Sequence, residues 1–346
     1  MQNSRIKLLN GFIIIVLLAF CFVAFPACKP ANQQKAVVVY TSVDQNYSEP
    51  ILKKFEAESG ITVLPVYDVE AAKTTGLVNR LLAEKNRPQA DVFWNGEFAQ
   101  TIMLKEQGIL SPYNSPVMAS IPQQYRDIDY CWSGFAGRAR VLIVNTGLIS
   151  PDKYPSSIFD LLESEYPAEK ISIAYPVFGT AATHAAALYA ALGREKARAF
   201  FVQLKDRGIQ VVDGNSMVRD LVASGQHSMG LTDTDDACGA LRNKAPVAII
   251  FPDQDSMGTL VIPNTVALIK DAPHRNTAEK LIDFLLSPET ESLLVESGWS
   301  HIALRPTNAK PQFLATSNIK GMDVSLDEVY AQLEIIKRDM PEIFIR

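Results

Sequence analysis

Short apolar runs alternate with amphipathic segments along the chain, and this alternation predicts strands and helices in turn. Residues 37–40 form a β-branched run typical of a buried strand, and residues 49–59 place apolar side chains on one helical face before Gly60. The same patterns predict strands at residues 61–66, 91–94, 141–144, 171–174, 209–212 and 229–231, and helices at residues 76–85 and 180–192. This β-α-β order predicts an α/β fold in which helices cover a parallel sheet.

A long apolar stretch at residues 260–269 follows the second α/β series, and it is long enough to return from one lobe to the other. No long linker interrupts the chain, so we expect two lobes with a cleft between them. The expected boundaries are residues 37–137 plus 263–312 for lobe 1, and residues 138–262 plus 313–346 for lobe 2. Because ligands of open α/β sheets bind at the carboxyl ends of the strands, the loops that follow the strands form the candidate site.

Capping residues predict where two later helices begin. Asn276 is placed to cap a helix that runs to Leu286, with Pro288 after its end. Ser325 and Glu328 have the spacing of a capping box for the last helix.

The N-terminal segment predicts export. Arg5 and Lys7 precede an apolar run at residues 12–25, which is shorter than the roughly 20 residues that span a bilayer. Residues 25–28 resemble a bacterial lipoprotein cleavage site. We therefore expect residues 1–28 to be a signal peptide with a lipidated Cys28, and an ordinary secretory signal cut nearby is the alternative.

The polar residues 29–36 then read as a tether that holds the domain off the membrane. The expected location is periplasmic or at the cell surface, with membrane contact through the lipid anchor only. Such a compartment permits a disulfide between Cys131 and Cys238, although we expect both to be buried, unpaired thiols.

Composition and motifs exclude several functions. The chain has 346 residues, 47% hydrophobic and 21% charged, with a net charge of −5. No basic stripe is present, so no nucleic-acid partner is expected, and we expect a monomer. The sequence lacks the dinucleotide, P-loop, nucleophile-elbow and zinc-protease motifs, so we expect no enzyme. The four histidines favour packing or surface roles: His184, His227, His274 and His301.

Carboxylates follow three of the predicted strands. Asp44 lies after the first strand, Glu97 after the third, and Asp233, Asp235 and Asp236 after residues 229–231. Carboxylates that converge in a cleft repel one another unless a cation is bound. This favours either a hard metal ion with oxygen ligands or an organic cation such as an amine. Helix capping is the competing interpretation for each of these residues.

A second group of residues suits an anion. Gly179 and Thr180 lie between a strand and a helix, where backbone N–H groups bind negative charge and the Thr180 hydroxyl adds a donor. Asn215 opens the next helix in the same way, and Arg138 and Arg140 are placed to reach the same cleft. The competing interpretation is an ordinary glycine turn and helix cap.

The order and spacing of these motifs resemble the ferric-ion-binding periplasmic proteins that serve ABC importers. The stretches that carry the resemblance are residues 39–42, 55–63, 90–94, 137–141, 179–180, 214–216 and 258–262. The resemblance implies a type II periplasmic-binding fold, with two lobes that close by a hinge at crossover strands. It also implies delivery of the ligand to an ABC permease driven by a separate ATPase.

The resemblance further implies Fe³⁺ as the transported ligand, together with a synergistic anion. The positions that match are Asp44, Glu97, Asp235 and Asp236 for the metal, and Gly179, Thr180, Asn215, Arg138 and Asp233 for the anion or ligand. The chain departs from the family pattern, because Asp235 and Asp236 stand where a tyrosine pair is usual and Asp44 stands where a histidine is common. A small organic ligand, such as a phosphonate, a sugar phosphate or a thiamine-like cation, is therefore the alternative.

Overall fold

The computed structural model describes residues 35–67, 75–315 and 318–344. The predicted signal peptide, the lipidation site Cys28 and tether residues 29–34 lie outside these residues, and Ala36 already begins the first strand. Residues Ala36–Arg346 form one compact unit. None of the helices in the described part of the chain is long and apolar enough to cross a membrane.

The strands form one ten-stranded sheet in the order β2-β1-β3-β10-β5-β8-β6-β7, with β4 beside β10 and β9 beside β5. The bounds are β1 Ala36–Thr41, β2 Thr62–Tyr67, β3 Val92–Asn95, β4 Leu110–Ser111, β5 Trp132–Asn145, β6 Ile171–Ala174, β7 Gln210–Val212, β8 Met229–Asp233, β9 Val247–Ile250 and β10 Val261–Ile269. The pairs β1–β2, β1–β3, β6–β7 and β6–β8 are parallel, as the sequence predicts. The strands β5 and β10 pair antiparallel with their neighbours, so the whole sheet is mixed.

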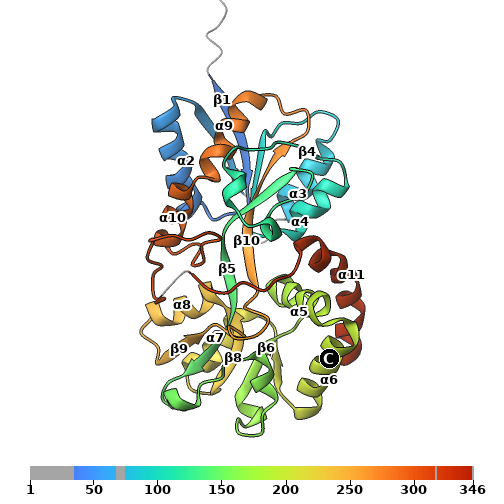
Figure 1. Cartoon of the computed structure of the whole chain (residues 1–346), viewed down its shortest axis with the longest axis vertical. Helices are drawn as coiled ribbons and strands as arrows, with labels where there is room; N and C mark the ends of the chain where they lie inside the picture. Colours follow the sequence, from blue (N-terminus) through green and yellow to red (C-terminus); the bar gives the residue numbers. More distant parts are fainter. Residues whose placement is uncertain (1–34, 68–74, 316–317, 345–346) are drawn as a thin grey trace, which may run out of the picture. The chain divides into compact units, whose positions relative to one another are not determined.

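Helices cover both halves of this sheet (Figure 1). The α-helices are α2 Gln45–Ser59, α3 Thr75–Ala83, α4 Ala99–Glu106, α5 Gly179–Leu192, α6 Arg194–Arg207, α7 Asn215–Ala223, α8 Thr234–Arg242, α9 Arg275–Leu285, α10 Pro288–Ser297 and α11 Leu326–Ile343. Short 3-10 turns occur at Met118–Ser120, Gln123–Tyr125, Pro151–Lys153, Ile158–Leu162 and Ala168–Lys170. The predicted α/β, two-lobed fold is confirmed, while the exact lobe boundaries stay a prediction.

The strand β5 joins the two halves. Its residues 132–139 pair with β10, and its residues 140–145 pair with β8 and β9. The strands β5 and β10 therefore run side by side through the middle of Figure 1, where the chain crosses between the halves. All nine residues of β10 are buried, which explains the long apolar run in the sequence.

The predicted cap of α9 is wrong, and the predicted cap of α11 is right in position but not in its hydrogen bonds. The helix α9 begins at Arg275 rather than after Asn276, because buried Asp91 accepts hydrogen bonds from the His274 backbone N–H at 2.7 Å and the ring Nδ1 at 3.0 Å. Ser325 does stand at the N-cap of α11, but its side chain makes no capping bond, so the capping box does not form. Cys131 and Cys238 are free and buried, as expected.

Gly230 in β8 is a position where the fold tolerates no side chain. A Cβ there would lie 2.4 Å from Val218 Cγ1 and 2.7 Å from the Ser172 carbonyl oxygen, and a backbone oxygen cannot move aside cheaply. We expect Gly230→Ala to lower the free energy of unfolding by about 1–3 kcal/mol, measured by urea denaturation. Gly239→Ala in α8 is the control, since its Cβ meets only Arg219 at 4.0 Å and alanine favours a helix. Equal stability of the two variants would contradict this account of β8.

Candidate functional site

A buried network joins the middle of β5 and the end of β8 to the first turns of α5 and α7. Arg140 Nη1 lies 2.6 Å from Asp233 Oδ1, and both side chains are almost fully buried. The other oxygen of Asp233 accepts hydrogen bonds from the Thr180 hydroxyl at 2.5 Å and from Asn215 Nδ2 at 2.9 Å. The same Arg140 nitrogen also donates to Asn215 Oδ1 at 2.9 Å. The polar groups that the sequence assigns to the anion site are thus bonded to one another.

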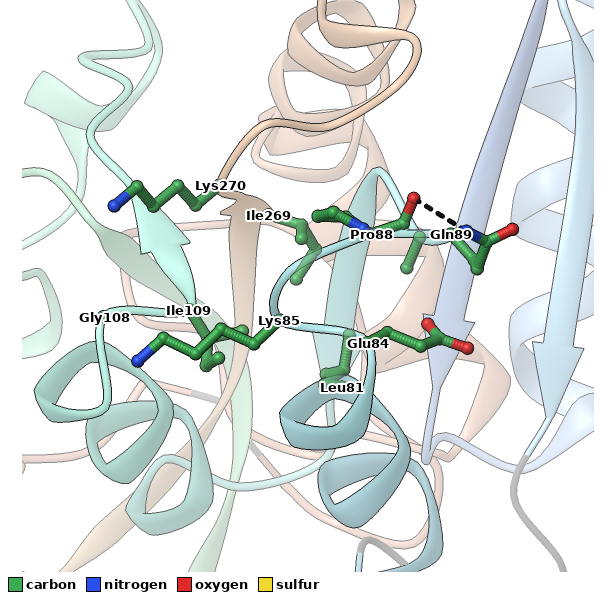
Figure 2. Close-up of a pocket in the computed structure, with 10 residues that line it drawn as sticks. Leu81, Glu84, Lys85, Pro88, Gln89, Gly108, Ile109, Ile269 and Lys270 are labelled. Atoms are coloured by element: carbon green, nitrogen blue, oxygen red, sulfur yellow. Dashed lines mark hydrogen bonds between the residues drawn. The ribbon is translucent and has the colours of Figure 1, made fainter.

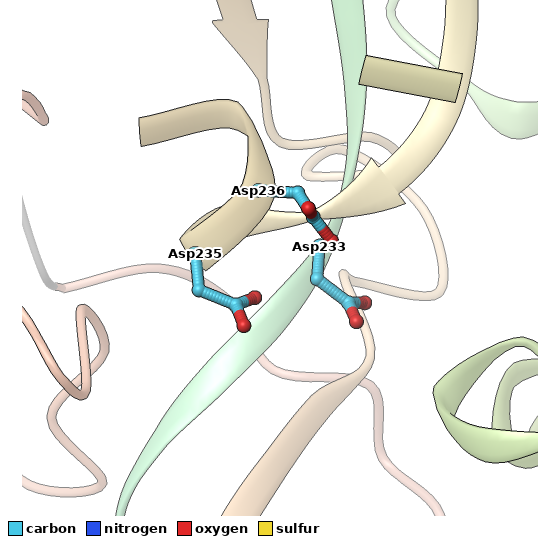
Figure 3. Close-up of side chains that lie close together, drawn as sticks. All are labelled: Asp233, Asp235 and Asp236. Atoms are coloured by element: carbon cyan, nitrogen blue, oxygen red, sulfur yellow. The ribbon is translucent and has the colours of Figure 1, made fainter. Parts of the chain in front are cut away.

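Three carboxylates gather where β8 meets α8 (Figure 3). One oxygen each from Asp233, Asp235 and Asp236 lies within 4.8 Å of the others. Asp235 pairs with Arg138 at 3.2 Å, and Asp236 pairs with Arg219 at 3.2 Å. Together with the buried pair of Asp233, each carboxylate of the trio therefore has an arginine partner.

Residual repulsion remains within the trio. Burial, followed by the neighbouring charges of Asp235 and Asp233, raises the pKa of Asp236 to about 7, although Arg219 opposes the shift. Burial also acts to raise the pKa of Asp235, but Arg138 outweighs it and lowers that pKa below its usual range. The arginines therefore offset the negative charge only in part, and Arg219 is shared with the exposed Asp220.

The other two predicted metal ligands lie outside this trio. Glu97 accepts backbone hydrogen bonds from Ala99 at 2.5 Å and Gln100 at 2.9 Å, so it caps α4. Burial raises the pKa of Glu97 in spite of these bonds. Asp44 occupies the N-cap position of α2 without a side-chain capping bond. The capping interpretation thus describes Glu97, and the structure does not bring Asp44 into the trio.

A cleft of about 700 Å³ opens beside this network. Residues from both halves of the sheet line it, together with α11: Glu97, Ala99, Gln100, Met103, Glu106, Arg138, Val177, Phe178, Gly179, Thr180, Ala182, Thr183, Tyr330, Ala331, Leu333, Glu334 and Lys337. The N-terminus of α5 faces this space without a side-chain cap. Gly179 has φ of +53°, and no atom lies within 4 Å of where its Cβ would be, so the backbone there is open to a ligand.

Arg138 connects the two sides of this cleft. It leaves β5, pairs with Asp235 on α8, and donates to the Gly96 carbonyl oxygen after β3 at 3.4 Å. The Arg138 side chain is 20% exposed, whereas the Arg140 side chain is buried. Arg138 is thus the guanidinium that a ligand in the cleft can contact.

Three charged or titratable residues near the site were not assigned to it from the sequence. Arg219 on α7 pairs with Asp236, but no local motif links two residues on different helices. His301 is fully buried with no hydrogen-bond partner on either ring nitrogen, and burial, together with Arg242 and Arg138, lowers its pKa to about 4 against the pull of Asp235. Burial and Arg140 likewise hold the pKa of His184 well below its usual range.

Another pocket lies between α3, β4 and β10 (Figure 2). Its volume is about 10 Å³, which is no more than one water requires. It is lined by Leu81, Glu84, Lys85, Pro88, Gln89, Ala90, Gly108, Ile109, Ile269 and Lys270. This pocket is too small for a solute. The cleft is the candidate site because Glu97, Arg138, Gly179 and Thr180, which the sequence assigns to the site, all line it.

The fold and the cleft define a two-lobed receptor for a small solute. Residues 88–322 match the family described as bacterial extracellular solute-binding protein, and the chain belongs to that family. Proteins of this kind are periplasmic binding components of ABC importers rather than enzymes.

Relatives within this group differ in the ligands for which they are named. The chain is 26% identical over 314 residues to iron uptake protein A1 of Synechocystis sp., covering 88% of this chain and 86% of the relative. It is 24% identical over 350 residues to the putative 2-aminoethylphosphonate-binding periplasmic protein of Salmonella typhimurium, covering 96% of each. A Trichodesmium protein (IdiA, FutA) solved in complex with iron and citrate superposes with a TM-score of 0.80 at 21% identity, covering 90% of this chain and all of that one.

The raised pKa of Asp236 predicts a specific dependence of stability on pH. Its pKa is about 7 when folded against 3.8 as the model-compound value, so the folded chain binds the proton more tightly. This stabilisation is complete below about pH 4 and is lost as the pH rises through 7. The unfolding free energy of the wild type should therefore fall between pH 4 and pH 8 as Asp236 loses its proton. In Asp236→Asn this fall should be smaller by on the order of 2–4 kcal/mol.

The control for this prediction is Asp220→Asn. Asp220 is 66% exposed and contacts the same Arg219, so its removal should leave the pH dependence unchanged. Urea denaturation at several pH values measures both variants. A wild-type slope in Asp236→Asn would contradict the assigned pKa.

Proposed function

We propose that this chain is a lipid-anchored receptor that captures a small organic solute bearing a phosphonate or phosphate group and delivers it to an ABC permease with a separate ATPase. The anchor is Cys28, and the two lobes close over the solute. The observation that carries the choice of ligand is that the candidate metal carboxylates already have partners, while an uncapped helix N-terminus and Arg138 face an open cleft.

The ion pairs argue against a trivalent metal in the carboxylate trio. Arginines 140, 138 and 219 pair with aspartates 233, 235 and 236 respectively. Each of the two cleft-side arginines holds one oxygen of its aspartate, so a ferric ion would have to compete with Arg138 and Arg219 for Asp235 and Asp236. The pair of Arg140 and Asp233 is buried on both sides, and breaking a buried pair costs about 3–5 kcal/mol. The phenolate pair that the family resemblance implies is replaced by carboxylates that arginines already hold.

The cleft supports an oxyanion ligand. Its volume of about 700 Å³ lies within the range of roughly 300–1,000 Å³ for small-molecule sites. The helix α5 is 14 residues long, and its N-terminal N–H groups and dipole favour negative charge. Arg138 also lines the cleft and adds a charged donor. Thr180 contributes its backbone, because its hydroxyl hydrogen is already donated to Asp233.

A metal ion is the second candidate. The three carboxylates lie within 4.8 Å of one another, and the raised pKa of Asp236 shows that their mutual repulsion is not fully offset. The relatives named for iron uptake and ferric iron support the same alternative. In this case Asp235, Asp236 and Glu97 would act as ligands, after the two arginines moved aside.

Isothermal titration calorimetry of the purified protein separates the two candidates. The probes are 2-aminoethylphosphonate, inorganic phosphate and ferric citrate. We expect one of the two phosphorus compounds to bind with a Kd in the micromolar range or below. Binding of ferric citrate alone would overturn the proposed ligand class, and binding of none of the probes would refute both candidates as stated.

Arg138 and Arg219 are both partly exposed, and their substitution is expected to affect ligand binding differently. Arg138→Gln should weaken binding of the phosphorus probe about 10- to 100-fold, since it removes a charged hydrogen bond to the oxyanion. Arg219→Gln is the control, because Arg219 also pairs with one aspartate of the trio but does not line the cleft. This variant should change the Kd less than about threefold. Tighter binding of ferric citrate by Arg138→Gln would instead favour the metal site.

A further inference from the structure

The strand β5 contains a strained residue where it crosses between the halves of the sheet. Ala136 is fully buried and has φ of +40°, in the left-handed region that alanine rarely adopts. The register between β5 and β10 shifts at this point, between Pro263 and Asn264, so Ala136 is the extra residue of a bulge. Strain of this kind persists only where surrounding contacts hold it.

Side chains hold both sides of this bulge. Glu291 on α10 accepts a hydrogen bond from the Ala136 N–H at 2.8 Å, and Asn264 Nδ2 donates to the Ala136 carbonyl oxygen at 3.1 Å. Glu291 is itself buried and bonded to Arg305 Nε at 2.6 Å and to the Leu304 N–H at 2.8 Å. The bulge is thus fixed to α10 and to the segment that follows it.

Trp299 connects this bulge to α2 and to the loop that carries Glu97, which lines the cleft. Its Nε1–H donates to Asn264 Oδ1 at 3.0 Å. The Nδ2 of the same Asn264 amide is the donor to the Ala136 carbonyl oxygen. The indole ring packs on Tyr47 in the first turn of α2, with centroids 5.2 Å apart. Its Cζ2 also lies 3.6 Å from the Cβ position of Gly96, which directly precedes Glu97. One side chain thus packs on the first turn of α2, lies beside Gly96 after β3, and is bonded to β10, the strand that pairs with β5.

We propose that Trp299 is a positioning residue for solute capture, which couples the first turn of α2 and the loop that carries Glu97 to the bulge at Ala136 through Asn264. This inference rests on the proposed receptor function. A solute that orders the loop of Glu97 holds the indole in place, and the indole orients the Asn264 amide. That amide in turn holds the Ala136 carbonyl, in the strained peptide about which the lobes turn. A purely structural Trp299 would support packing but would not link this carbonyl to the loop.

The test variant is Trp299→Phe, which keeps an aromatic ring against Tyr47 and removes only the N–H donor. Trp132→Phe is the matched control. Trp132 is buried in the same strand as Ala136, but its indole nitrogen has no hydrogen-bond partner, so its loss should not affect the bulge. Circular dichroism and the Tm establish that both variants fold.

The first measurement needs no ligand. The probe is the Gly137 amide, which belongs to the same peptide unit as the Ala136 carbonyl that Asn264 holds and which donates to the Ile302 carbonyl oxygen. Its hydrogen exchange in the ligand-free protein should be at least tenfold faster in Trp299→Phe than in wild type, and unchanged in Trp132→Phe. An unchanged rate in Trp299→Phe would overturn the inference, whatever the protein binds.

The second measurement uses 2-aminoethylphosphonate as the probe. We expect Trp299→Phe to raise its Kd about 3- to 10-fold and to diminish the decrease in radius of gyration that small-angle scattering records on binding. Asn264→Ala should have the same effect, and the double variant should be no worse than the more affected single variant. Additive losses in the double variant would refute the coupling. If wild type binds none of the probes, the proposed function is refuted, and the hydrogen-exchange measurement alone then tests the role of Trp299.

Discussion

The buried ion pair between Arg140 and Asp233 determines how the rest of the site is built. It lies where β5 enters the second half of the sheet, and the two atoms are 2.6 Å apart. Because either charge alone would be destabilising in this interior, the pair constrains β5 and β8 to this register. The remaining hydrogen bonds of Asp233 then place Thr180 and Asn215, and with them the first turns of α5 and α7. The open N-terminus of α5 is a consequence of that arrangement.

Under the proposed function, the same pairing favours an oxyanion over a cation in the cleft. An isolated group of three aspartates would favour a cation, whereas three aspartates that each contact an arginine form a site of much lower net charge. Arg138 is the member of this group that remains accessible from the cleft, so the surface offered to a solute includes a guanidinium and a helix N-terminus. The negative charge of Glu97 is directed toward the N-terminus of α4. This is why the ligand class follows from the partners of the acidic residues rather than from their number.

Hydrophobic periodicity predicted most of the fold because each buried strand and amphipathic helix leaves a local signature. The strands at residues 171–174 and 261–269 show this best, since both are buried along their whole length. Local signals failed where distant residues decide the structure. Asp91 sets the start of α9 from 183 residues away, and no local pattern records that contact. The helix α10 was missed because Pro288 was read as a stop, whereas it occupies the first turn and Ser287 caps the helix.

The sequence likewise predicted the residues of the candidate site but not the distant side chains that they contact. Strand ends predicted that Asp233, Asp235, Gly179 and Arg138 are neighbours, because loops at one edge of a sheet converge, and of these Gly179 and Arg138 line the cleft. Their partners were not predictable, since Arg140 and Asp233 are 93 residues apart and Arg219 lies on a different helix from Asp236. The bulge at Ala136 has no sequence signal either, because alanine does not favour its left-handed backbone.

We propose that arginines occupy the acidic cluster and leave the cleft to an organic oxyanion. Native mass spectrometry of the protein isolated from its own cell envelope, without chelators or refolding, tests this most directly. The account predicts a bound organic mass that contains phosphorus and is absent from Arg138→Gln. A stoichiometric iron adduct without an organic phosphorus compound would contradict it.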